Sequence, residues 1–114
     1  MINEQRLVDA FIRLVSINGP SACECEVADT VEAELKSFGF DVRRDNSGER
    51  IGGNTGNVIA FKKGSVANAV PITLNAHMDT VAPTDKLVCK IENGVIKSSG
   101  DTILGADDRA GIAA

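Results

Sequence analysis

One segment of this 114-residue sequence restricts the accessible folds more than any other. Residues 70–76 are mostly apolar, and a loop rich in Gly, Ser and Asn precedes them. A short apolar run bounded by such a loop is typical of a central strand that is buried on both faces of a sheet. His77 follows at the carboxyl end of this expected strand. The segment therefore predicts a sheet that is covered by helices.

Two helices are expected before this strand. Apolar residues recur at helical spacing from Leu7 to Ile17, Asn3 stands at the N-cap position, and residues 18–20 (Asn-Gly-Pro) should end the first helix. Ser21 and Glu24 have the spacing of a capping box, which would begin the second helix. Its apolar stripe should then run to Gly39, a good residue for a left-handed C-cap.

Shorter patterns predict the remaining elements. Asn93-Gly94 is the strongest short-range signal for a tight type I′ hairpin. A polar loop, expected to be mobile, should occupy residues 45–57, and a further helix should begin near Asp107. Together these elements predict an α/β fold with a mixed sheet and flanking helices. The expected short strands are residues 40–44, 58–62, 87–92 and 95–98.

Composition and charge exclude several classes of protein. The net charge of −4 and the lack of a Lys/Arg cluster argue against nucleic acid as a partner. Apolar stretches fall far short of the roughly 20 residues that span a bilayer, so we expect no membrane contact and a cytoplasmic location. Cys23, Cys25 and Cys89 are odd in number and lack CxxC spacing, which predicts reduced thiols.

Two short motifs could carry chemistry. His77 and Asp79 are two residues apart, so in an extended chain both side chains emerge on one side. A neutral imidazole is a good zinc ligand, and a carboxylate behind it can fix its tautomer. Asp107 and Asp108 stand at the expected start of a helix, where exposed N–H groups favour negative charge. Each motif also has an ordinary explanation, as a hydrogen-bonded histidine at a strand end and as an acidic N-cap.

Residues 77–81 (His-Met-Asp-Thr-Val) and 105–111 (Gly-Ala-Asp-Asp-Arg-Ala-Gly) resemble, in order and separation, the two N-terminal metal motifs of peptidase T-like M20 metallopeptidases. Residues 39–40 and 56–58 are similar to that family as well, so the resemblance spans nearly the whole chain. It implies that residues 1–114 are the N-terminal portion of a zinc-binding catalytic domain. The remaining catalytic segment and a lid and dimerisation domain would lie downstream.

The resemblance also implies roles for individual residues. His77 would bind one of two zinc ions, and the catalytic Asp79 would orient His77 from behind. Asp107 would bridge both ions, Asp108 would be a supporting acid, and the peptide bond between these two residues would be cis. A glutamate base and further ligands would come from downstream sequence, so the 114 residues alone should be inactive.

The implied activity is that of a zinc-dependent aminopeptidase that releases N-terminal residues from short peptides such as tripeptides. A homodimer is compatible with the full-length protein. Two alternatives stay open. The first is an M20-type carboxypeptidase or N-acyl amino acid deacylase, with the same metal motifs and another substrate. The second is a non-enzymatic interaction module whose metal site has decayed.

Overall fold

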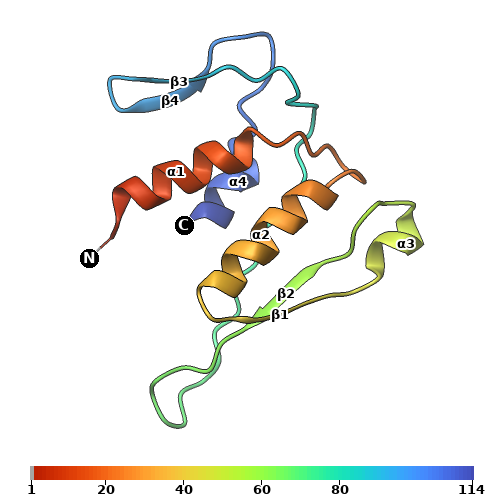
Figure 1. The fold of residues 1–114 in the computed structure, drawn as a ribbon, viewed down its shortest axis with the longest axis vertical. Coiled ribbons are helices and arrows are strands. Elements are labelled where there is room, and N and C mark those ends of the chain that lie inside the picture. The colour runs from red at the N-terminus through yellow and green to blue at the C-terminus, as the bar shows by residue number, and fades with distance from the viewer. Residues whose placement is uncertain (1) are drawn as a thin grey trace.

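The computed structural model describes residues 2–114 as a mixed α/β arrangement (Figure 1). Helix α1 lies at the centre beside α4, and α2 separates this pair from the β1–β2 hairpin. The β3–β4 hairpin lies on the other side of α1. The α/β class with flanking helices is thus confirmed. The elements are α1 (Glu4–Val15), α2 (Cys25–Ser37), β1 (Asp41–Arg44), α3 (Ser47–Ile51), β2 (Val58–Phe61), β3 (Cys89–Glu92), β4 (Val95–Ser98) and α4 (Ala106–Ala113).

Helix α1 forms as the sequence predicts and supplies most of the core. The Asn3 side chain accepts a hydrogen bond of 3.0 Å from the backbone N–H of Arg6, which caps the first turn. The apolar face of the helix packs against α2 and α4, so segments from both ends of the chain meet in one cluster. Its buried members are Ala10, Phe11, Leu14, Val15, Val27 and Ala113.

Helix α2 ends as predicted but begins differently. Gly39 has φ +78°, and the N–H groups of Gly39 and Phe40 donate to Lys36 O and Leu35 O, which completes a Schellman motif. The expected capping box is wrong. Glu24 is the N-cap residue without a side-chain cap, and the Ser21 hydroxyl donates instead to Asp79, far away in the sequence.

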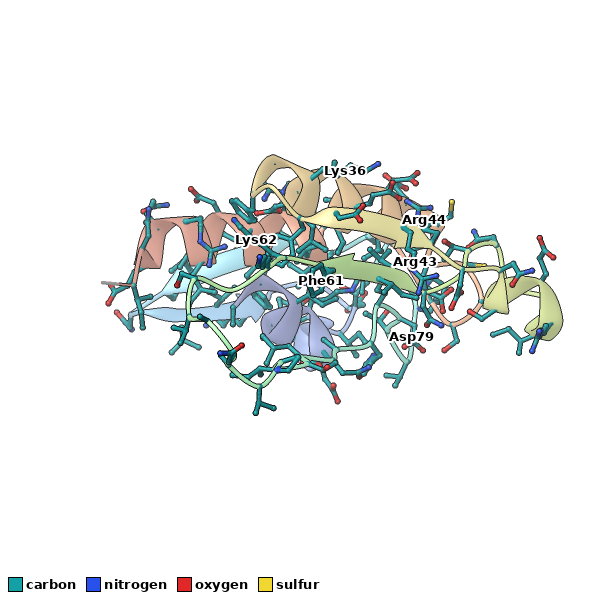
Figure 2. All side chains as sticks on the ribbon, turned by 90° about the horizontal axis from the view of Figure 1, so that it is seen from below. Lys36, Arg43, Arg44, Phe61, Lys62 and Asp79 are labelled. Carbon is teal, nitrogen blue, oxygen red and sulfur yellow. The ribbon has the colours of Figure 1, made fainter. Side chains whose placement is uncertain are left out.

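The strands form two separate antiparallel pairs, β1 with β2 and β3 with β4. Asn93 (φ 53°) and Gly94 (φ 75°) both have positive φ, so the turn between β3 and β4 is the predicted type I′ turn. The β1–β2 pair docks on α2 through Arg44, which is labelled on its strand in Figure 2. Arg44 forms ion pairs with Asp29 at 2.6 Å and with Glu32 at 2.7 Å.

The prediction of a buried central strand over residues 70–76 is wrong. This segment has no regular secondary structure, and Val70, Ile72 and Leu74 are 85%, 87% and 89% exposed. A strand exists only through hydrogen bonds to a neighbouring strand, and within residues 2–114 no such neighbour pairs with it. The chain regains a partner at Thr80, which forms an isolated parallel bridge with Pro20.

The expected mobile loop over residues 45–57 contains helix α3. Asp45 organises it, because its carboxylate accepts hydrogen bonds from Asn57 and from the backbone and hydroxyl of Ser47. These bonds, with Asn57 the largest contributor, hold the pKa of Asp45 well below its ordinary value. Among residues 2–114, no helix is long and apolar enough to cross a bilayer.

Candidate metal-binding site

His77, Asp79 and Asp107 lie together, although Asp107 is 30 residues from His77 in the sequence. The imidazole contacts Asp79 Oδ1 through Nδ1 at 2.9 Å and Asp107 Oδ1 through Nε2 at 3.0 Å. The structure therefore brings the three predicted site residues within side-chain reach. It does so without the expected strand, since an irregular extended segment leads into His77.

Asp79 sets the orientation of the imidazole. Its Oδ1 faces Nδ1, and its backbone carbonyl lies 3.1 Å from the same nitrogen. Both groups are acceptors, so Nδ1 carries a proton, and in the neutral imidazole Nε2 then has the lone pair. The other oxygen of Asp79 accepts from the Ser21 hydroxyl, which is the largest cause of the lowered pKa of Asp79. The predicted orienting role of Asp79 fits this geometry.

The contact between His77 and Asp107 is one that either a proton or a metal ion could bridge. A lone pair on Nε2 and a carboxylate oxygen 3.0 Å away repel each other unless a proton or a metal ion lies between them. A proton on Nε2 is one way to remove this repulsion, because a hydrogen bond to Asp107 is the largest cause of the raised pKa of His77. One nitrogen and one oxygen are ligand types that zinc accepts. Two ligand atoms of a tetrahedral zinc site lie roughly 3.3 Å apart, so this separation fits the metal.

The ligand atoms are accessible while the supporting group is less so. The side chains of Asp107, His77 and Asp79 are 94%, 51% and 31% exposed, in that order. Both oxygens of Asp107 can therefore reach a cation from solvent. Within residues 2–114, no group of three or more His, Cys, Asp or Glu side chains is placed to hold a metal ion.

Asp107 and Asp108 are not an ordinary acidic helix cap. Gly105 (φ 72°) is the N-cap residue of α4 and makes no side-chain cap, and both acids have non-helical backbone angles. The peptide bond between them is cis, as predicted. Asp108 turns back onto α4, because a Cβ added at Gly111 would lie 2.4 Å from its Oδ1. The two neighbouring carboxylates therefore point to different surroundings.

Arg109 belongs to the site although sequence reasoning gave it no role. Its side chain is fully buried, and Nε donates to Met78 O at 2.8 Å, between His77 and Asp79. Burial lowers its pKa, and the Asp79 and Glu24 carboxylates oppose this shift. An arginine keeps its charge in proteins, so a buried cation lies directly beneath the site.

The loop between α1 and α2 forms the base of the site. Thr80 N donates to Gly19 O at 3.0 Å, and Thr84 N donates to Asn18 Oδ1 at 2.8 Å. Together with the bond from Ser21 to Asp79, these contacts fasten the segment after His77 to the end of α1. The sequence indicated only a helix stop and a helix cap here, because its local pattern carries no trace of such distant partners.

Comparisons with known proteins agree with the fold. No protein-family model matches the chain. The uncharacterized protein YqjE of Bacillus subtilis is 39% identical over 114 residues, which cover 100% of this chain and 30% of YqjE. The cytosol non-specific dipeptidase of Escherichia coli is 30% identical over 124 residues, which cover 98% of this chain and 24% of the dipeptidase. The succinyl-diaminopimelate desuccinylase of Corynebacterium glutamicum is 33% identical over 91 residues, which cover 77% of this chain and 22% of the desuccinylase.

Two solved structures are similar along nearly the whole chain. Aminopeptidase PepT from Bacillus cereus superposes with a TM-score of 0.93 at 35% identity and covers 98% of this chain. A tripeptidase from Staphylococcus aureus gives 0.92 at 33% identity and covers 99%. In both cases the chain spans 30% of the solved protein.

The sequence similarity places the chain among the M20-type peptidases and their relatives. Within that class, the two solved structures relate it specifically to the peptidase T-like enzymes, and the expected relationship is confirmed.

Proposed function

We propose that this chain forms the N-terminal portion of the catalytic domain of a zinc-dependent aminopeptidase. The substrates would be short peptides such as tripeptides, from which one N-terminal residue is released. One observation carries the proposal: Asp79 holds His77 from behind while Nε2 faces the exposed carboxylate of Asp107 at 3.0 Å. The aminopeptidase and the tripeptidase of similar fold support the substrate class.

Each site residue has a separate task in this proposal. His77 would be a ligand to one zinc ion through Nε2, and Asp107 would bridge two zinc ions with its two oxygens. Asp79 keeps the imidazole in the tautomer that can bind metal. Asp108 would support the site electrostatically from the start of α4. When bound, zinc polarises the scissile carbonyl and lowers the pKa of an attacking water.

A cytoplasmic location is part of the same proposal. It is supported by the similarity to a dipeptidase whose name places it in the cytosol. The general base and the remaining ligands would come from residues outside this chain. We therefore expect no peptidase activity from residues 1–114 alone.

An N-acyl amino acid deacylase is the second candidate, and the similarity to the desuccinylase favours it. Both candidates use the same metal ligands, so His77 and Asp107 do not distinguish them. A decayed site in an interaction module fits less well. Loss of function would leave no reason for Asp79 and Asp107 to keep converging on one imidazole, with Ser21 holding Asp79.

Zinc titration by calorimetry tests the metal site. We expect His77→Ala and Asp107→Asn each to weaken zinc binding at least about tenfold, because each removes a ligand. Asp101→Asn is the matched control, since Asp101 is an exposed acid outside the site, and it should bind like the wild type. Equal affinity in wild type and His77→Ala would contradict the proposal. Hydrolysis of tripeptides against N-acyl amino acids by the full-length protein then separates the two candidates.

A further inference from the structure

Arg109 is the largest side chain that is fully buried, and its hydrogen bonds join three separate segments. Nε donates to Met78 O at 2.8 Å. Nη1 donates to Leu14 O and, at 3.3 Å, to Ile17 O. These partners lie 31, 95 and 92 residues away in the sequence. One guanidinium thus links the start of α4, the end of α1 and the segment that carries the histidine.

The bond to Met78 matters because of where Met78 lies. Its carbonyl belongs to the peptide unit between Met78 and Asp79, so holding this carbonyl orients the backbone that joins His77 to Asp79. Arg109 is itself two residues after Asp107. The arginine therefore connects both metal-binding motifs, one through a hydrogen bond and one through two peptide units.

The end of α1 makes this connection rigid. The last carbonyls of a helix have no partner within the helix and carry partial negative charge, so they attract a cation. Leu14 O in the last turn of α1, which also accepts from the N–H of Ile17, and Ile17 O just beyond the helix both accept from Nη1. They leave Nε directed at Met78 O. The other arm, Nη2, has no hydrogen-bond partner among the described residues, and it lies where a Cβ on Gly19 would be 2.8 Å away. Close packing around the fork thus limits its rotation.

We propose that Arg109 is a positioning residue that sets His77 relative to Asp107. The inference rests on the metal site proposed above. A purely structural role would be limited to docking α4 on α1. Arg6 already performs that role at the other end of α4, where Nη1 and Nη2 donate to Ala113 O at 3.3 and 3.2 Å. Helices α1 and α4 lie side by side, so Arg6 and Arg109 act on the same helix pair (Figure 1).

The matched variants are Arg109→Met, Arg109→Lys and Arg6→Met. Met keeps much of the length of the arginine stem without its donors, whereas Lys keeps the charge but loses the planar fork. His77 is the only histidine, so the imidazole ¹⁵N signals report its tautomer without overlap. Zinc affinity and thermal midpoint are measured on the same samples, at one fixed pH.

In the wild type we expect one tautomer, with the proton on Nδ1. Arg109→Met should shift the ring signals toward a mixture of tautomers and raise the zinc Kd by about 10- to 100-fold, the range for groups that orient a ligand. Arg109→Lys should recover part of both losses. Arg6→Met should lower the thermal midpoint while leaving the tautomer and the zinc Kd unchanged.

The proposal is overturned if Arg109→Lys keeps the wild-type tautomer and zinc Kd. It is also overturned if Arg6→Met changes both as much as Arg109→Met does. Should Arg109→Met fail to fold, Arg109→Lys against Arg6→Met provides the same comparison. Absence of zinc binding in the full-length wild type would refute the proposed function, and the tautomer measurement would still decide the role of Arg109.

Discussion

Replacing Gly19 by alanine tests the packing around the buried arginine. The backbone of Gly19 lies outside the left-handed region, so the added methyl group matters only through its contacts. A Cβ there would lie 2.8 Å from Arg109 Nη2 and 2.8 Å from Val27 Cγ2. Both neighbours are fully buried, so neither can move toward solvent. The substitution must therefore displace Arg109, Val27 or the end of α1.

The expected cost follows from these two contacts. Overpacking a close-packed interior by one methyl group costs about 1–3 kcal/mol, and contacts on two sides favour the upper half of that range. With a urea slope of about 1.5 kcal/mol per M, a loss of about 2–3 kcal/mol lowers the unfolding midpoint by roughly 1.3–2 M. Urea denaturation followed by circular dichroism measures this shift. Displacement of Arg109, as opposed to Val27, would also lower the zinc affinity of this variant.

Gly64→Ala is the matched control. A Cβ at Gly64 meets no atom within 4 Å, and its φ is not in the left-handed region. This variant should be as stable as the wild type, or more stable by up to about 1 kcal/mol through the unfolded chain. The reasoning is refuted if Gly19→Ala unfolds within about 0.5 kcal/mol of the wild type, or if both alanine variants lose stability equally.

Two further predictions concern single carboxylates. Ser21→Ala removes a donor to Asp79, so the Asp79 pKa should rise toward its ordinary value in a ¹³C-carboxylate NMR titration; an unchanged pKa would show that this hydrogen bond has no effect. The depressed pKa of Asp45 stabilises the fold above its ordinary value of 3.8, and this contribution is lost as the pH falls below that value. The stability difference between wild type and Asp45→Asn should therefore be largest near neutral pH and shrink in acid, and a constant difference would contradict the assignment.

Local signals predicted local structure well. Asn3, Gly39 and Asn93-Gly94 act through hydrogen bonds or backbone angles within a few residues of themselves, and each has its predicted role. The prediction of a strand over residues 70–76 was wrong for the opposite reason, because burial and strand pairing depend on residues far away in the sequence. The predicted capping box at Ser21 was wrong for the same reason. Its spacing to Glu24 indicated a helix cap, whereas the Ser21 hydroxyl donates a hydrogen bond to a carboxylate 58 residues away.

The site was predictable in part. The types and spacing of His77 and Asp79, and the resemblance of both motifs to a known family, were enough to expect the convergence of His77 with Asp107. Arg109 could not be recognised in the same way. Its partners are backbone carbonyls, which every residue has, so no side-chain pattern marks them. An arginine directly after paired acids reads as a surface ion pair until its burial is known.

The bond from Arg109 to Leu14 also constrains the order of folding. It joins residues 95 positions apart, and the Arg6 contact with Ala113 spans 107. Contacts of such separation require closure of nearly the whole chain, whereas both hairpins and α2 need only short loops. During synthesis, the part of α1 that packs against α4 stays uncovered until residue 109 has left the ribosome. Helix α1 is therefore synthesised first but completes its packing last. The arrangement of His77 and Asp107 forms only when α4 packs against α1.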